Sequence, residues 1–548
     1  MEIYDGEPLR HMADLPAMAA DRYADHPAFV SFGQERTYGE VDERANRVAS
    51  ALVDAGVEPG DRVGLFIPNT LQFPESYFGA MRAGAVPVPL NLRMDPETLV
   101  YVVQNAEADV LIGSPLLADE VQNLAAAADV STLFLPGVSD DGVVNYSHAV
   151  QEGDPDFERV ERAYDDVACQ PYTSGTTGDP KGVLLTHENL LTTIEAYDGG
   201  AIAVDPENSI LLVLPLFHIY GLNAIMGTYM YGGGTMYLQP EPEGEAMLRA
   251  ISDNEITHFA GVPAMFNMMW REYRGNEADY DLSSLENVNC AAAPLADDVR
   301  RTIENAWEVP MVEGWGMTET GPAGTVEPSR GVKKSAGCIG PALNDIELKL
   351  VDPATGDTVV GADQLDPFPD PDLPYDNEEA VTGEIAIRGP NVFEGYFKLP
   401  EKTDAVFDDE GFFYTEDIAR VDSDGYFWMV DRADDMIIAG GENIYPAEVE
   451  GALYEHPDVA EAAVVGAPHE IKGEAPVAFV VLEEGAEVTE AELRKFSLEH
   501  VASYAHPRRI FFVDELPRSA TQKVQRYRLE EEVESRLEEP LTSSGEEL

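Results

Sequence analysis

A run of glycine and hydroxyl residues is the clearest sign of chemistry in this chain. Residues 172–183 read YTSGTTGDPKGV. The glycines would let backbone N–H groups approach phosphate oxygens, and the hydroxyls would add further donors. These residues are Thr173, Ser174, Gly175, Thr176, Thr177 and Gly178. Lys181 would add a positive charge. The run lacks the Gly-Lys-Ser/Thr ending of a Walker A loop, so it predicts another kind of phosphate-binding loop, with a polar turn between strands as the alternative.

Two further charged residues stand in notable surroundings. Glu319 lies in the segment GWGMTET (314–320), where a carboxylate oxygen could hold Mg²⁺ beside a triphosphate. Lys523 is the one lysine among the last fifty residues. A positioned ammonium there could stabilise negative charge that develops on a phosphate oxygen. The alternative for each residue is an ordinary solvated surface charge.

The elements that would position these residues alternate between helix and strand. Helical apolar spacing covers residues 41–57, 71–83 and 96–106, and short apolar strands cover residues 62–67, 85–90 and 109–112. A similar rhythm runs through residues 210–239 and 256–262. Repeated βα units predict an α/β fold in which helices cover parallel sheets.

A second, smaller domain is predicted beyond residue 432. Its helices are expected at residues 446–456 and 489–500, and its strands at 460–465, 477–482 and 509–513. This pattern indicates a small α+β domain of about a hundred residues. Residues 361–379 are rich in Pro and Asp and predict a surface insertion.

The charge balance excludes several classes of partner. The chain has 548 residues, with 35 Lys+Arg against 102 Asp+Glu, and a net charge of −67. Such acidity argues against binding nucleic acid or anionic membranes. Because acids replace lysines along the whole chain, we infer adaptation to a salt-rich cytosol, as in extreme halophiles. An acidic mesophilic surface is the alternative.

Other features favour a cytoplasmic protein without a membrane anchor. The three cysteines, Cys169, Cys290 and Cys338, are far apart and indicate neither a zinc site nor a disulfide framework. The N-terminus lacks the pattern of a signal peptide. Residues 208–240 contain no charged side chain, but Pro and Gly interrupt them repeatedly. They predict a strand, a loop, a buried helix and another strand, with no transmembrane segment.

Residues 172–183 resemble the phosphate loop of the adenylate-forming superfamily, which includes acyl-CoA synthetases. Seven further segments resemble that family's motifs and follow in its order. They are LPLFHIYG (214–221), AAAPL (291–295), GWGMTE (314–319), YTED (414–417), DRADDMII (431–438), GGENIYP (440–446) and PRSATQKV (517–524).

The resemblance implies a domain division and site residues. It implies an N-terminal AMP-binding domain (1–431), a hinge (432–435), a mobile C-terminal domain (436–530) and an acidic tail (531–548). The residues implied for catalysis are Lys523, Glu319, Thr318 and His218. A core histidine with satisfied hydrogen bonds is the alternative for His218. Those implied for Mg²⁺ are Glu319 and Thr176. Those implied to bind ATP or CoA are the 173–178 loop and Lys181, Ala292, Ala293, Pro294, Gly314, Trp315, Gly316, Asp417, Arg432, Asp434, Gly440, Gly441 and Glu442.

The implied reaction has two halves. A carboxylic acid reacts with ATP to give an acyl-adenylate and diphosphate, and CoA then displaces AMP. Amino-acid adenylation domains usually carry an Asp near positions 217–218, and none occurs between 208 and 240. We therefore expect an apolar acid, with medium- or long-chain fatty acids favoured and aryl acids as an alternative. Two other functions are alternatives. The protein could be a ligase that loads a carrier protein in place of CoA, or a nucleotide-binding regulator without catalysis. The oligomeric state, with a homodimer as one option, is not fixed by the sequence.

Four positions depart from the family pattern. Glu416 and Gln522 stand where Gly is usual, Trp315 stands where Tyr is usual, and Ala505 stands where Lys is common. An extra acid at position 416 could repel ATP or point into solvent. None of the four removes a group that the chemistry needs.

Overall fold

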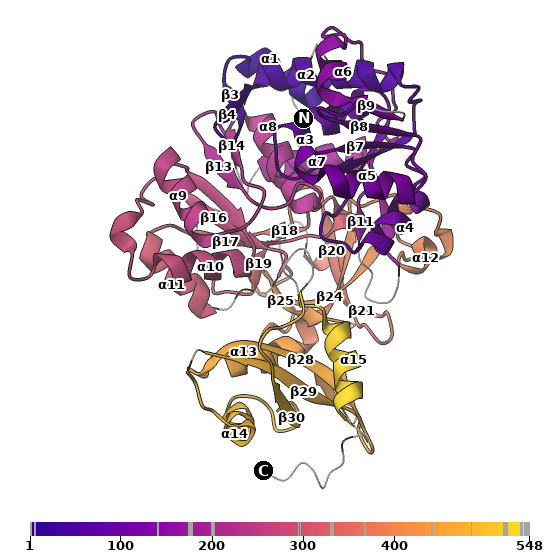
Figure 1. Ribbon diagram of the computed structural model, residues 1–548. Helices are drawn as coiled ribbons and strands as arrows, with labels where there is room; N and C mark the ends of the chain where they lie inside the picture. The colour runs from indigo at the N-terminus through magenta and orange to yellow at the C-terminus, as the bar shows by residue number, and fades with distance from the viewer. Residues whose placement is uncertain are drawn as a thin grey trace. The chain divides into compact units, whose positions relative to one another are not determined.

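The chain divides into two compact units in the computed structural model (Figure 1). The first comprises residues 1–347 and 387–413, and the second residues 348–386 and 414–548. The structure describes residues 3–4, 7–139, 142–173, 179–198, 203–293, 295, 297–328, 334–365, 369–433, 435–439, 442–483, 485–518, 524–537 and 541.

A five-stranded parallel sheet lies in the first unit, in the order β6-β5-β7-β8-β9. Its strands are β5 (Arg62–Phe66), β6 (Val86–Pro89), β7 (Val110–Gly113), β8 (Thr132–Leu135) and β9 (Val143–Asn145). Apolar residues of α4 (Pro96–Ala106) and α5 (Ala118–Ala127) pack with those of the strands in one buried cluster. Parallel strands need such helical cover because they are buried on both faces.

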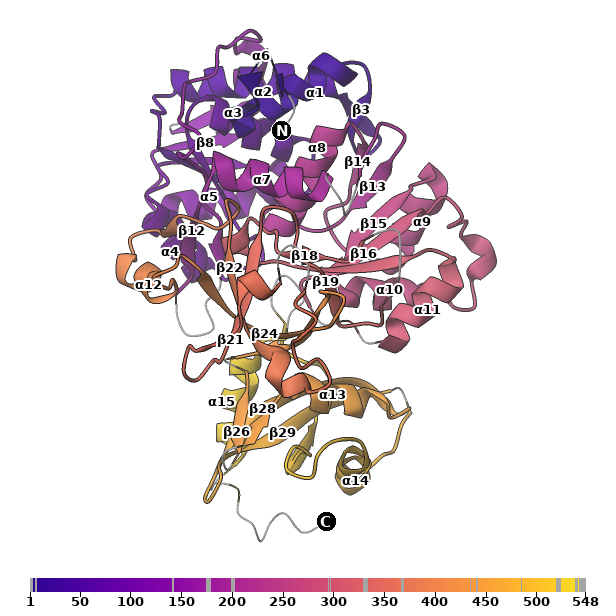
Figure 2. The same ribbon diagram turned by 180° about the vertical axis from the view of Figure 1, so that it is seen from behind.

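An eight-stranded sheet has the order β18-β17-β16-β15-β13-β14-β3-β4. It is parallel from β17 to β3, with antiparallel strands at both edges. Its strands are β3 (Pro27–Ser31), β4 (Gln34–Thr37), β13 (Ser209–Leu212), β14 (Thr235–Leu238), β15 (His258–Gly261), β16 (Asn287–Ala291), β17 (Met311–Trp315) and β18 (Thr325–Val326). Helices α9 (Gly244–Asn254), α10 (Pro263–Tyr273) and α11 (Asp297–Trp307) lie beside this sheet (Figure 2).

A small antiparallel sheet completes the first unit. Its strands are β10 (Val167–Cys169), β11 (Tyr172–Thr173), β12 (Lys181–Thr186) and β23 (Gly395–Tyr396), and β12 pairs with all three others. The unit also contains the hairpin β1 (Ile3–Tyr4) and β2 (Glu7–Pro8) and the short strand β19 (Cys338–Gly340). Its remaining helices are α1 (Leu15–Tyr23), α2 (Tyr38–Asp54), α3 (Gln72–Arg82), α6 (Tyr146–Glu152), α7 (His187–Asp198), the π-helix η3 (Tyr220–Gly227), α8 (Thr228–Gly232), α9 (Gly244–Asn254), α10 (Pro263–Tyr273), α11 (Asp297–Trp307) and α12 (Pro400–Ala405).

The second unit contains two sheets. One has the order β25-β24-β22-β20-β21, with strands β20 (Glu347–Val351), β21 (Thr358–Val360), β22 (Thr382–Arg388), β24 (Phe413–Val421) and β25 (Phe427–Arg432). The other contains β26 (Ile437–Ala439), β27 (Glu442–Ile444), β28 (Val459–His469), β29 (Gly473–Leu482) and β30 (Arg509–Phe512). Helices α13 (Pro446–Tyr454) and α15 (Arg526–Arg536) pack on β28, and α14 (Glu490–His500) packs on β30.

The structure confirms the predicted fold class of parallel sheets covered by helices, with an α+β region near the C-terminus. The charge-free segment 208–240 folds as β13, a loop, the buried helices η3 and α8, and β14, as its sequence predicts. No helix in the described part of the chain has the length and apolar character that a bilayer span requires.

Salt dependence tests the origin proposed for the acidity. At a net charge of −67 self-repulsion opposes the compact state, and molar salt shortens the Debye length to about 3 Å. We therefore expect the melting temperature to rise steadily between 0.1 M and 3 M KCl. Sorbitol at matched osmolality does not screen charge and is the control. A melting temperature that does not change with KCl would contradict the halophilic adaptation. An equal rise in sorbitol would contradict it as well.

Candidate active site

Strands β11 and β12 form the two arms of a hairpin around the predicted phosphate loop. Thr173 pairs with Lys181, so these residues face each other where the loop begins and ends. The hydroxyl oxygen of Thr173 is buried and has no hydrogen-bond partner among the described residues. A buried polar atom of this kind needs a partner, and a ligand oxygen would supply one. Residues 174–178 (Ser174, Gly175, Thr176, Thr177 and Gly178) lie outside the described residues.

Tyr396 links two of the predicted site residues. Because β23 pairs with β12, the Tyr396 ring lies beside Lys181, whose Nζ is 4.4 Å from the ring centroid. The Tyr396 hydroxyl donates to Glu319 Oε1 at 3.0 Å. The structure thus brings together Lys181 and Glu319, which are 138 positions apart in the chain. The sequence analysis missed Tyr396, since nothing local distinguishes it among 23 tyrosines.

The Glu319 loop is buried and held by several hydrogen bonds. Glu319 is 5% exposed and Thr318 is 9% exposed. The Glu319 carbonyl accepts a hydrogen bond from the Phe393 N–H at 2.9 Å. The buried Asn391 amide donates to the carbonyls of Thr320 and Ala323 at 2.9 and 2.7 Å. A buried carboxylate is costly unless a partner or a cation compensates it, so this loop presents a suitable hard ligand for Mg²⁺.

The segments predicted to contact adenine leave the eight-stranded sheet side by side. Strands β16 and β17 are parallel, and Ala291 pairs with Gly314. Ala292 and Ala293 therefore follow β16 at the carboxyl edge, where α/β sheets bind ligands. Ala292 has a φ of 71°, a left-handed conformation that is unfavourable for a residue with a Cβ. Pro294 lies outside the described residues.

The end of β17 is closely packed. Trp315 is 7% exposed. A Cβ at Gly316 would approach the Pro322 carbonyl oxygen to 1.7 Å, so only glycine fits there. The predicted stacking of Trp315 on adenine stays a prediction.

A buried ion network that the sequence analysis missed lies at the end of β17. Arg300 donates to Glu313 Oε1 and to Glu327 Oε2, both at 2.9 Å. Each of these three residues is at most 5% exposed. Burial raises the pKa of Glu313, and the Arg300 guanidinium opposes this shift. Because Glu313 directly precedes Gly314, this network fixes the strand end that carries the predicted adenine contacts.

His218 lies in the middle of the predicted acyl motif (214–221). It is half-buried, and its Nδ1 accepts the Tyr220 N–H at 3.4 Å. The preceding segment is anchored by buried Asn69, whose amide donates to the carbonyls of Leu212 and Leu214. His218 is thus less buried than His187 or His258, which are 2% and 9% exposed.

In the second unit, the two residues predicted to bind ribose are cross-strand neighbours. Asp417 pairs with Arg432 across β24 and β25, and Arg432 Nη1 lies 3.1 Å from Asp417 Oδ1. Glu416 accepts from Arg432 Nη2 at 3.1 Å. Glu416 has a φ of 61°, which explains why Gly suits this position in the family pattern. The Glu416 carboxylate, which is unusual at this position, therefore forms an ion pair with Arg432.

The comparisons with known proteins decide the family. Residues 17–397 match the model of the AMP-binding enzyme, and residues 448–523 match that of the AMP-binding enzyme C-terminal domain. The chain belongs to the AMP-binding enzyme family. This result confirms the family expected from the motifs.

Relatives of this family match over nearly the whole chain. The chain is 36% identical to a feruloyl-CoA synthase of Amycolatopsis, covering 90% of this chain and 93% of the relative. It is 31% identical to the long-chain-fatty-acid–CoA ligase of Bacillus subtilis, covering 96% of each. Among solved structures, ATP-bound MatB from Rhodopseudomonas palustris is 31% identical, with a TM-score of 0.83 over 95% of this chain and 98% of the other.

The remaining predicted residues of the AMP-binding enzyme are only partly described. Asp434, Gly440, Gly441 and Lys523 lie outside the described residues. Glu442 begins β27 and pairs with Ala439 in a hairpin that brackets the two glycines. The predicted hinge and the catalytic role of Lys523 therefore stay predictions.

Arg526, three residues after Lys523, forms an anchor that the sequence analysis missed. Its Nε donates to Asp435 at 3.1 Å, and its guanidinium also pairs with Glu450 of α13. It donates further to the Val464 carbonyl at 3.0 Å. The start of α15 is thus tied to the residue directly after the predicted hinge position.

We expect Arg526→Gln to lower the free energy of unfolding by about 1.5–3 kcal/mol, because two partly buried carboxylates lose a charged donor. Arg528→Gln, an exposed change on the same helix, is the control and should stay within about 0.5 kcal/mol of wild type. Urea unfolding monitored by fluorescence measures both. Equal midpoints for the two variants would show that this anchor is not structural.

Proposed function

We propose that this AMP-binding enzyme is an ATP-dependent acid–CoA ligase that works through an acyl-adenylate. A substrate carboxylate oxygen attacks the α-phosphorus of ATP, and the bond to diphosphate breaks. The CoA thiolate then attacks the acyl carbonyl carbon, and AMP leaves. The observation that carries the proposal is the contact of Lys181, Tyr396 and Glu319 at the end of the phosphate-loop hairpin.

The residues of the first unit are suited to the phosphates and the base. Lys181 and the 173–178 loop hold the β- and γ-phosphates, and Thr318 lies beside them. Glu319 and Thr176 hold Mg²⁺, which neutralises phosphate charge when bound. The segments 292–294 and 314–316 flank adenine, and His218 borders the carboxylate.

Residues of the second unit take the other roles. Asp417 and Arg432 bind the ribose hydroxyls. Lys523 stabilises the charge that develops on the α-phosphate oxygens during adenylation. Rotation about Asp434 then withdraws Lys523 and presents Gly440, Gly441 and Glu442 to CoA, as a conformational gate between two reactions.

The acid has an apolar body and no free ammonium group. This follows from the uncharged segment 208–240, which offers no carboxylate to an amine. The sequence favours medium- or long-chain fatty acids, and aryl acids fit the same criterion. Relatives are named for both classes, as a long-chain-fatty-acid–CoA ligase and as feruloyl-CoA and 4-coumarate–CoA enzymes.

CoA-dependent release of AMP from ATP tests the proposal, in molar KCl, with acetate, octanoate, palmitate, benzoate and hydroxycinnamate. We expect AMP and a thioester with at least one acid. Acid-dependent exchange of diphosphate into ATP without any thioester would favour loading of a carrier protein instead. No turnover and no exchange with any acid would contradict the ligase.

A further inference from the structure

Two buried asparagines connect the strand that carries Lys181 to the loop that carries Glu319. Asn189 lies near the start of α7, and Asn391 lies in the bridge segment, residues 390–394, which precedes β23. The two asparagines are 3% and 0% exposed. Both belong to the first unit, and neither lies in a segment that resembles a family motif. Their amide groups bond to backbone carbonyls, which indicates that they position the chain around them.

Asn189 fixes the end of β12. Its Oδ1 accepts the Thr186 N–H at 2.8 Å, and its own backbone N–H donates to the Thr186 hydroxyl at 3.1 Å. These reciprocal bonds are of the capping-box type and start α7 directly after β12. The side-chain nitrogen of Asn189 donates to the carbonyls of Pro390 and Val392 at 2.8 and 2.9 Å. One side chain therefore joins β12, α7 and the bridge segment.

Asn391 continues the connection to the Glu319 loop. Its side-chain nitrogen donates to the Thr320 carbonyl at 2.9 Å and to the Ala323 carbonyl at 2.7 Å. Its Oδ1 is buried and has no hydrogen-bond partner in the described part of the chain. The position therefore uses the two N–H donors of an amide, and a carboxylate of the same shape could not replace them. A Cβ at Gly389 would come within 2.6 Å of this Oδ1, so the glycine leaves room for the amide.

Backbone hydrogen bonds tie the bridge segment to the same two partners. The Phe393 N–H donates to the Glu319 carbonyl at 2.9 Å, and the Glu394 N–H donates to the Leu184 carbonyl of β12 at 3.0 Å. The bridge segment is thus bonded to β12 on one side and to the Glu319 loop on the other. Because the bonds of a buried network support one another, this segment sets where the Glu319 carboxylate lies relative to β12.

We infer that Asn189 and Asn391 are positioning residues of the proposed ligase, and that they hold Glu319 at the distance from Lys181 that Mg²⁺ and the triphosphate require. The inference rests on the proposed function, in which Glu319 holds the metal and Lys181 holds the phosphates. Mg²⁺ demands near-ideal octahedral geometry, so it tolerates little displacement of a ligand. A shift of about 1 Å in a positioned group can cost about 10²-fold in rate. Loss of either amide should therefore change the Mg²⁺ requirement.

A Mg²⁺ titration of acid-dependent diphosphate exchange into ATP tests this inference, at saturating ATP and acid in molar KCl. Asn391→Leu keeps the approximate size of the side chain and removes both donors. Asn189→Asp keeps the acceptor that caps α7 and removes the donors to the bridge segment. We expect each variant to need about tenfold more Mg²⁺ for half-maximal exchange, and to lose about tenfold or more in maximal rate.

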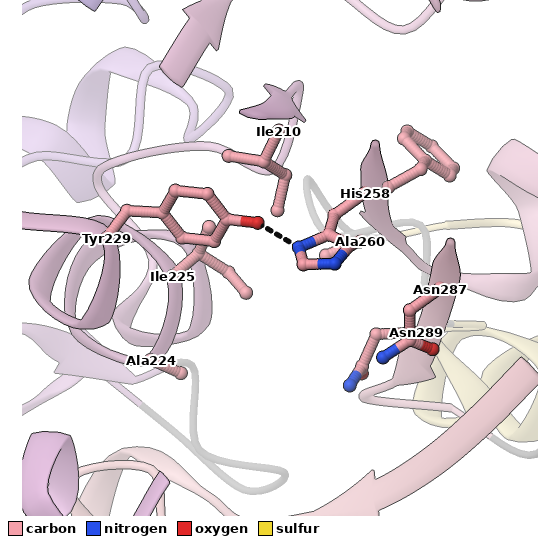
Figure 3. A pocket seen from close by; sticks show the side chains of 9 residues that line it. Ile210, Ala224, Ile225, Tyr229, His258, Ala260, Asn287 and Asn289 are labelled. Atoms are coloured by element: carbon pink, nitrogen blue, oxygen red, sulfur yellow. Dashed lines mark hydrogen bonds between the residues drawn. The ribbon is translucent and has the colours of Figure 1, made fainter. Parts of the chain in front are cut away.

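Tyr229→Phe is the matched control, because it removes a buried hydrogen bond of the first unit that has no part in the proposed site. The Tyr229 hydroxyl is bonded to His258 Nδ1 in the wall of a small cavity between α8 and the strands β13 and β15 (Figure 3). This variant should lose stability and keep the Mg²⁺ requirement of wild type. If it raises that requirement as much as Asn391→Leu and Asn189→Asp do, the effect is a general loss of structure and the inference is overturned.

A double variant tests whether the amides act through Glu319. If they do, Asn391→Leu added to Glu319→Gln should lower exchange by less than about threefold beyond Glu319→Gln alone, since the group that Asn391 positions has already lost its charge. Independent effects would instead multiply to about 10³-fold below wild type. If Asn391→Leu does not fold, Asn189→Asp takes its place in the double variant.

The outcomes separate this inference from the proposed function. An unchanged Mg²⁺ requirement in both Asn391→Leu and Asn189→Asp would overturn the positioning role while the ligase stands. Effects that multiply in the double variant would overturn it as well. Absence of acid-dependent exchange in the wild-type enzyme would instead overturn the ligase itself.

Discussion

Lys523→Ala should lower acid-dependent exchange of diphosphate into ATP by about 10²–10³-fold, because adenylation loses the cation that meets the charge developing on the α-phosphate. The second half-reaction does not use this charge, so thioester formation from a supplied acyl-adenylate should persist at a far higher fraction of wild type. Steady-state exchange and single-turnover thioester formation measure the two halves separately.

Lys495 provides the matched control for this experiment. It is an exposed lysine on α14 of the same unit, so Lys495→Ala removes an equal charge without touching the proposed chemistry. Both half-reactions should stay near wild type in this variant. Unchanged exchange in Lys523→Ala would mean that Lys523 is a solvated surface lysine and that another group stabilises adenylation. It would also revive the interpretation of the chain as a non-catalytic nucleotide binder.

Glu319→Gln should lower the rate of adenylation by about 10²-fold and raise the Mg²⁺ concentration needed for half-maximal rate. The glutamine has the same shape and can still accept from the Tyr396 hydroxyl, but it lacks the negative charge that a hard divalent cation requires. A Mg²⁺ titration of diphosphate exchange at saturating ATP measures both effects.

Two further variants separate metal binding from structural support. Tyr396→Phe removes one hydrogen bond and keeps the carboxylate, so its effect should be about tenfold at most. Glu394→Gln, an exposed change beside β23, should leave the adenylation rate and its Mg²⁺ dependence unchanged. If Glu319→Gln has the Mg²⁺ dependence of wild type, Glu319 supports the loop and does not hold the metal.

The local elements of this fold could be predicted from the sequence. Proline at the start of α4 and of α13, with Asp95 as the N-cap of α4, marks where these helices begin. Both begin at the predicted residues 96 and 446. The alternation of apolar strands with amphipathic helices was sufficient to predict the parallel sheets, because that pattern can be recognised in short stretches of sequence.

The partners that hold the site could not be predicted in this way. Tyr396 meets Glu319 across 77 positions, and Arg526 meets Glu450 across 76. The first contact depends on the pairing of β12 with β23, and the second depends on two helices, α13 and α15, that both pack on β28. No local sequence pattern indicates either arrangement. Arg300 and Glu313 look like ordinary charges in so acidic a chain, and only their burial distinguishes them.

The most direct test of the account is to look for its intermediate. Enzyme in molar KCl is incubated with ATP, Mg²⁺ and the best acid, without CoA, and the mixture is analysed by mass spectrometry before and after CoA is added. The account predicts enzyme-bound acyl-AMP that disappears as acyl-CoA and AMP form in equal amounts. Acyl-CoA formed with no acyl-AMP at any time, and with ADP and phosphate in place of AMP and diphosphate, would contradict it.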